Sequence, residues 1–110
     1  MELADALIAL AHLEEAHAEL TAAVPYSACE EAPVEDVSHY LDHALDPLRA
    51  RVNGSGAGPG PRLCRRLMEI HDYVVVVQPL AEPGHEHLRR AALRIRQAVE
   101  LLSAATPADA

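Results

Sequence analysis

Residues 61–80 read PRLCRRLMEIHDYVVVVQPL, a stretch that combines a run of four valines with Arg66, His71 and Tyr73. On a helical wheel of 100° per residue, one face of it collects Leu63, Leu67, Ile70, Val74 and Val77. The run Val74–Val77 also suits a strand, because β-branched side chains lose χ1 freedom in a helix. In the rest of the chain the apolar residues repeat with the period of a helix. A single strand would therefore have no sheet to join. We therefore expect a helix over about 62–78.

Three other segments repeat apolar residues every three to four positions and predict helices over about 2–23, 34–52 and 85–104. The buried seam of the first is expected at Leu3, Leu7, Leu10, His17, Leu20 and Val24. Asp46-Pro47 indicates either a kink inside the second helix or the start of a new one. The stretch NGSGAGPG at 53–60 predicts a flexible linker, and 106–110 a frayed tail.

Four amphipathic helices predict an all-α protein, an up-down-up-down four-helix bundle that forms a single domain over residues 1–110. Half of the residues are hydrophobic, yet the chain has no Trp, no Phe and only three Tyr. The core is therefore expected to consist of Leu, Val, Ile and Ala, which suits closely packed helices.

The net charge of −8 is unevenly distributed, because residues 1–48 hold eleven acids and no base while residues 49–110 hold nine Arg and six acids. An acidic protein is a poor nucleic-acid binder, since that affinity comes from neutralising phosphates. We expect the opposite charges to meet within one bundle or across a symmetric dimer. The use of Arg for every basic residue is typical of a GC-rich bacterial genome.

The first residues, MELAD, lack the basic region of a secretory signal, and no apolar run reaches the roughly 18–20 residues of a membrane span. We therefore expect a cytoplasmic protein. Its two cysteines are too few for a disulfide scaffold or a cysteine-based zinc site. Cys29 and Cys64 are expected at opposite ends of the bundle, beyond the roughly 7 Å between Cα atoms that a disulfide allows.

Two histidine patterns are typical of metal ligands. Glu14 and His17 form a Glu-x-x-His pair of the kind found in di-iron bundles, and His39 and His43 lie four residues apart on one helix. The other helices, however, supply no inward carboxylate, and His39 and His43 fall opposite the expected buried face. We expect no metal and no cofactor, and a metal-binding bundle stays an alternative.

Arg66, His71 and Tyr73 form the pattern Arg-x4-His-x-Tyr, which resembles the signature of HEPN-domain ribonuclease toxins over about eight residues. The resemblance implies a small, commonly dimeric helical bundle that cleaves RNA without metal. Arg66 would stabilise phosphate charge, His71 would transfer the proton, and Tyr73 would match the residue modified for neutralisation. The chain departs from the family at Leu67, where a polar residue is usual. On an ideal helix Arg66 and His71 also diverge by about 140°.

Two sets of apolar residues are expected to face away from the bundle core. Leu93 and Leu101 lie off the seam of the last helix, and Cys64, Met68 and Val75 form a second strip on the helix over 62–78. These five residues predict a homodimer interface. The main functional prediction is a protein-interaction or regulatory module rather than an enzyme. Its partner is a second copy or another protein, with RNA as partner only in the HEPN-like alternative and no membrane.

Overall fold

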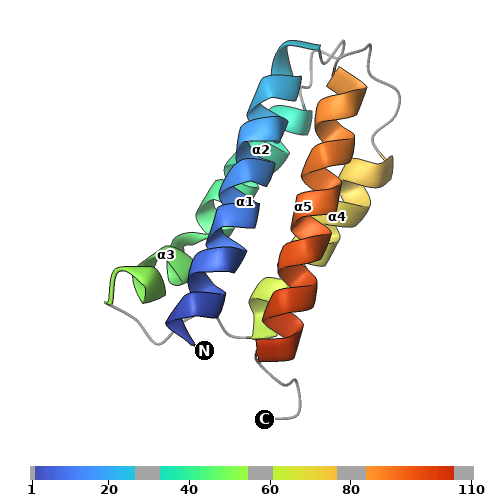
Figure 1. Cartoon of the computed structure of the whole chain (residues 1–110). Helices are drawn as coiled ribbons and strands as arrows, with labels where there is room; N and C mark the ends of the chain where they lie inside the picture. The colour runs from blue at the N-terminus through green and yellow to red at the C-terminus, as the bar shows by residue number, and fades with distance from the viewer. Residues whose placement is uncertain (1, 27–32, 55–60, 77–83, 106–110) are drawn as a thin grey trace.

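The computed structural model describes residues 2–26, 33–54, 61–76 and 84–105. These residues form helices and no strand, so the all-α prediction is confirmed for them. The elements, shown in Figure 1, are α1 (Leu3–Ala23), the 3₁₀ helix η1 (Val24–Tyr26), α2 (Pro33–Ala44), α3 (Asp46–Val52), α4 (Pro61–Val76) and α5 (Gly84–Ala105). Cys29, Val77 and the segments 55–60 and 106–110, on which expectations were placed, lie outside the described residues.

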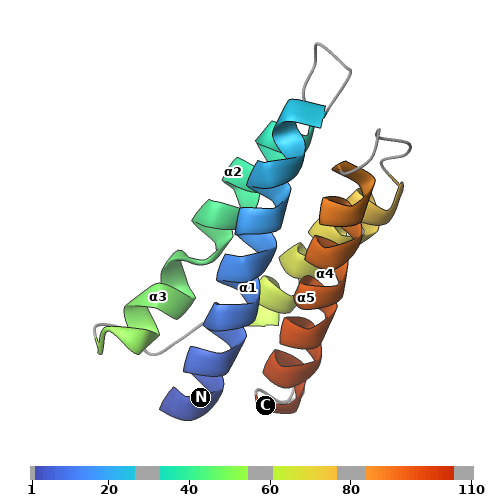
Figure 2. The same cartoon turned by 45° about the horizontal axis from the view of Figure 1, so that its top comes forward.

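The α1 and α5 helices are the most closely packed pair and run antiparallel, side by side in Figures 1 and 2. The buried face of α1 consists of Ala6, Ala9, Leu13, Ala16, Leu20 and Ala23. The buried face of α5 includes Leu88, Ala91, Ile95, Ala98 and Leu102. Both sets alternate steps of three and four residues, the period of helices that stay in contact along their length. Because alanine adds only one methyl group to the helix surface, the two helices can approach closely.

The buried side of α1 differs from the expected seam. Leu3 and Leu7 are about half exposed, at 45 % and 48 %, and His17 is only partly buried. Leu20 of the expected seam is fully buried, and Leu10 and Val24 pack against the core, so the seam is wrong in the first two turns, where Ala6 and Ala9 are buried instead. The reason is that α1 is apolar on several sides, so that either stripe could be buried. The alanine-bearing face of α5 favours the stripe that permits the closer approach.

The segment expected as one helix over 34–52 is two helices, α2 and α3, with the break at Leu45. Of the two interpretations of Asp46-Pro47, the new helix is the one observed: Leu45 is the N-cap residue of α3, and a proline occupies its first turn. Pro47 has no N–H to donate to the preceding turn, so a continuous helix would leave a carbonyl unpaired there. Leu48 on α3 is fully buried, which anchors this short helix to the core.

The α4 helix continues through Val76, so the β-branched run is helical as far as the structure describes it. Leu63, Leu67, Ile70 and Val74 form its buried face, as the helical period indicated. The α4 helix packs against α5 on one side and α2 on the other. Tertiary packing thus outweighs the preference of valine for strands.

Candidate functional site

The three residues of the HEPN-like pattern all belong to α4. Arg66 is exposed, and Tyr73 is 40 % exposed. The His71 side chain is largely buried and its Nδ1 atom lies 3.2 Å from Asp72 Oδ1, so the histidine interacts with its own neighbour in sequence. No contact among the described residues joins Arg66 to His71, and the resemblance stays a prediction.

The four candidate metal ligands are divided among three places. The Glu14 carboxylate accepts a hydrogen bond from Arg49, which is 2.9 Å away. His17 and His39 line a shallow hollow between α1 and α2, whereas His43 is exposed. Among the described residues no group of three His, Cys, Asp or Glu side chains is placed to hold a metal ion.

The hollow between α1 and α2 has a hydroxyl pair at its base. Thr21 donates to the carbonyl oxygen of His17 at 2.9 Å, so Ser38, whose Oγ atom lies 3.1 Å from Thr21 Oγ1, supplies the hydrogen between the two hydroxyls. Ser38 is the buried polar residue of the described core, and this bond satisfies it. The pair therefore has a structural role, joining α1 to α2.

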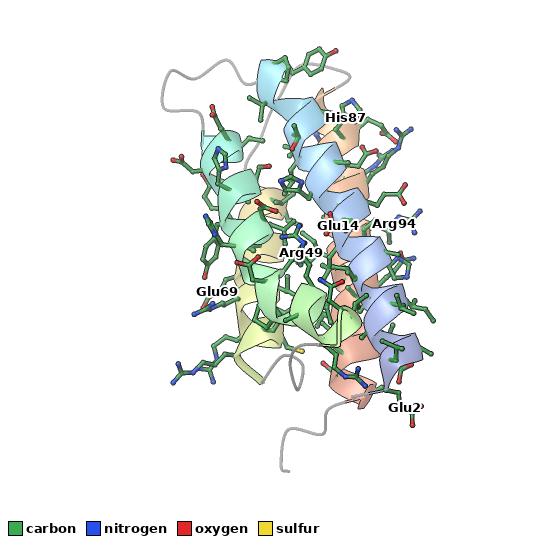
Figure 3. The ribbon with its side chains drawn as sticks, turned by 90° about the vertical axis from the view of Figure 1, so that its left-hand side faces the viewer. Glu2, Glu14, Arg49, Glu69, His87 and Arg94 are labelled. Carbon is green, nitrogen blue, oxygen red and sulfur yellow. The ribbon has the colours of Figure 1, made fainter. Side chains whose placement is uncertain are left out.

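Arg49 is the strongest electrostatic centre of the described residues. Its guanidinium lies between α1 and α3, beside Glu14 in Figure 3, and it contacts three helices. It donates to the Asp42 carboxylate at 2.8 Å, to the Asp42 carbonyl oxygen at 2.9 Å and to Asp46 at 3.4 Å. The hydrogen bond from Arg49 holds the pKa of the Asp42 carboxyl below its usual range. Arg49 thus compensates acids that the first half of the sequence leaves unpaired.

Replacing Arg49 with methionine is expected to lower the melting temperature at pH 7 by about 4–8 °C, because it leaves the three carboxylates without their shared cation. The folded-state pKa of Asp42 is depressed, so its stabilisation is complete above about pH 5 and is lost as the pH falls through about 4 and below. Melting curves of wild type and Arg49→Met should therefore converge in acid. Arg66→Met, at an exposed arginine, is the control, and an equal loss there would refute the assigned role.

A second polar contact runs along the edge between α1 and α5. His87 donates from Nδ1 to Glu19 at 2.7 Å and stacks on Tyr26, with ring centroids 6.3 Å apart. About two turns further along α5, Arg94 donates to His12 Nδ1 at 3.1 Å and lies 3.7 Å from Glu15. Figure 3 shows His87 and Arg94 on the side of α1 away from Arg49. Acidic residues from the first half of the sequence therefore pair with basic residues from the second half within one chain.

The five residues of the expected interface have different surroundings. Val75 and Leu93 are exposed, at 52 % and 56 %. Cys64 is a free thiol that packs against the core and accepts a hydrogen bond from Ser103 at 3.8 Å, and Met68 is partly buried. Leu101 also packs against the core, contrary to the outward position expected for it.

A group of exposed apolar side chains that was not predicted lies on the first half of α1. We call Leu3, Ala4, Leu7, Ile8 and Ala11 the α1 patch; all five are exposed, Ile8 to 51 %. The signal was present in the sequence, because Ala4, Ile8 and Ala11 are apolar positions that a single buried seam cannot include.

The α1 patch borders a hollowed surface. Leu7, Ile8 and Ala11 line a shallow depression together with His12, Glu15 and Arg94. A second depression shares Glu15 and Arg94 and extends along α5 to Leu93. The outer face of the α1–α5 pair is thus apolar at one end and carries mixed charges at the other.

Comparison of the chain with protein-family models, with curated proteins and with solved structures gives no significant match. Among the described helices, none combines the length and the apolar character that crossing a membrane requires.

Proposed function

We propose that this protein is a protein-interaction module that binds its partner through the α1 patch. The observation that carries the proposal is the exposure of three large apolar side chains, Leu3, Leu7 and Ile8, within two turns of one helix. Isolated exposed leucines are ordinary on protein surfaces, whereas a contiguous group marks an interaction site. Covering the exposed half of each side chain is favourable by about 1 kcal/mol.

The surroundings of the patch support binding to another protein surface. Protein interfaces combine an apolar centre with a polar rim in which arginine is enriched. Here His12, Glu15 and Arg94 border the patch on the side of α5. Their mutual contacts hold Arg94 next to the apolar residues while leaving its side chain 38 % exposed.

We also propose that the four helices form an up-down-up-down bundle and that the protein is cytoplasmic. The antiparallel α1–α5 pair supports an up-down-up-down four-helix bundle, with α2 and α3 together as the second helix. The free thiol of Cys64 supports a reducing compartment, the cytoplasm. The exposed apolar residues of the patch suit a second copy of this chain and another protein equally.

A photo-cross-linking side chain tests the proposal directly. With p-benzoylphenylalanine in place of Ala11, irradiation of cells that produce the protein is expected to give a protein adduct. The same group in place of Arg65, exposed on α4, is expected to give little. The mass of the adduct then identifies the partner as a second copy or another protein. Equal yields from the two positions would show that the α1 patch is no binding site.

A further inference from the structure

Four of the five residues of the α1 patch form a pattern that reads the same in both directions along the helix. Ala4, Leu7, Ile8 and Ala11 follow the order small, large, large, small, and all four are exposed on α1. A two-fold axis between Leu7 and Ile8 would place each alanine opposite an alanine of a second chain and each large side chain opposite a large one. A surface that is its own complement is what a symmetric dimer requires.

We infer that the partner of the α1 patch is a second copy of this chain, with the two α1 helices packed antiparallel about that axis. The inference rests on the proposed function, since it names the partner of the same site. Ala4 faces Ala11 of the second copy, and Leu7 faces Ile8. The outer side of α1 then repeats the packing that its inner side makes with α5, where alanines permit close antiparallel contact.

The charges around the patch suit this partner. In the antiparallel arrangement His12 lies opposite Leu3 of the second copy, so Arg94, which binds His12, comes opposite the start of the other α1 helix. That start carries Glu2, the N-cap residue, whose side chain makes no capping hydrogen bond. Figure 3 shows Glu2 and Arg94 along the same side of the molecule. Each copy therefore presents an arginine to a carboxylate of the other.

The size of the contact determines its strength. Five small and medium side chains per copy bury less than the roughly 1,200 Å² in total that stable interfaces exceed. We therefore expect a dimer that forms and dissociates with concentration, and that a single charge in the patch abolishes.

Engineered disulfides test the arrangement. Ala4→Cys and Ala11→Cys are made in a Cys29→Ser/Cys64→Ala background whose helical circular dichroism matches wild type. One of the two variants is labelled uniformly with ¹⁵N so that their masses differ, and the two are mixed at high concentration and oxidised. The expected product joins position 4 to position 11. Two copies of position 4 lie about 10 Å apart along the helices, beyond the roughly 7 Å between Cα atoms that a disulfide allows.

Two controls complete the experiment. Ala18→Cys, exposed on α1 beyond the reach of the second copy, is expected to give no disulfide with any variant. Adding Ile8→Glu to both cysteine variants should reduce the yield at least about tenfold, since it removes a buried apolar contact from each copy.

The outcomes separate the inference from the proposed function. Disulfides between two copies of position 4 would overturn the antiparallel arrangement and leave the patch a self-association site. Absence of any disulfide, together with a monomer by sedimentation at high concentration, would overturn the second copy as partner. An adduct of position 11 with another protein would then still support the interaction module, and its absence would overturn both.

Discussion

Replacing Ala16 with leucine is expected to lower the free energy of unfolding by about 2–3 kcal/mol. Ala16 is fully buried in the middle of α1, on the side that packs against α5. The larger side chain has no space between two closely packed helices, so it must push them apart and loosen the contacts of the neighbouring alanines as well. Urea denaturation followed by circular dichroism measures the loss.

The matched control is Ala18→Leu, two residues away on the exposed side of the same helix. It adds the same atoms and has the same small effect on helix propensity, so its change should stay within about 0.5 kcal/mol. Equal losses in the two variants would contradict the close α1–α5 contact, because the position on the helix would then be irrelevant.

Truncating Leu48 to alanine is expected to lower the free energy of unfolding by about 2–5 kcal/mol. Leu48 is fully buried and belongs to α3, which is seven residues long. A helix of that length has no stability of its own in water, so its attachment depends on tertiary packing and on the contacts of Arg49. Removing the Leu48 side chain leaves a cavity in the core and also weakens the attachment of α3 to it. Chemical denaturation and limited proteolysis around α3 measure the two effects.

Leu93→Ala serves as the comparison, since it removes the same atoms from a leucine that is 56 % exposed. The free energy of unfolding should change by less than about 0.5 kcal/mol. If Leu48→Ala were as mild as Leu93→Ala, α3 would not be docked on the core as the structure describes.

Much of the architecture follows from local sequence. The periodic apolar residues of α4 predict its buried face at Leu63, Leu67, Ile70 and Val74, because one helix turn brings every third or fourth residue to the same side. Pro47 predicts a disturbance near residue 46, because a residue without an N–H cannot continue a helix undisturbed. These features depend on neighbours within a few positions, which a sequence displays directly.

The candidate site depended on contacts between distant residues. Arg49 binds Glu14 from 35 positions away, and Arg94 binds His12 from 82. Leu101 is apolar and off the expected seam, yet it packs against the core. No local pattern contains such information, since it depends on which helices become neighbours and at what distance.

The sequence by itself established that α1 is a helix, but only the tertiary structure decided which of its sides is buried. With Ala6, Ala9, Ala16 and Ala23 on one side and Leu3, Leu7 and Ile8 on others, the helix is apolar in more than one direction. Leu13 and Leu20 are buried beside these alanines, whereas hydrophobicity alone would also bury Leu3 and Leu7. Packing against α5 favours the alanines, because small side chains let two backbones approach and bury a longer contact. The large side chains that remain outside are what make the first half of α1 a binding surface.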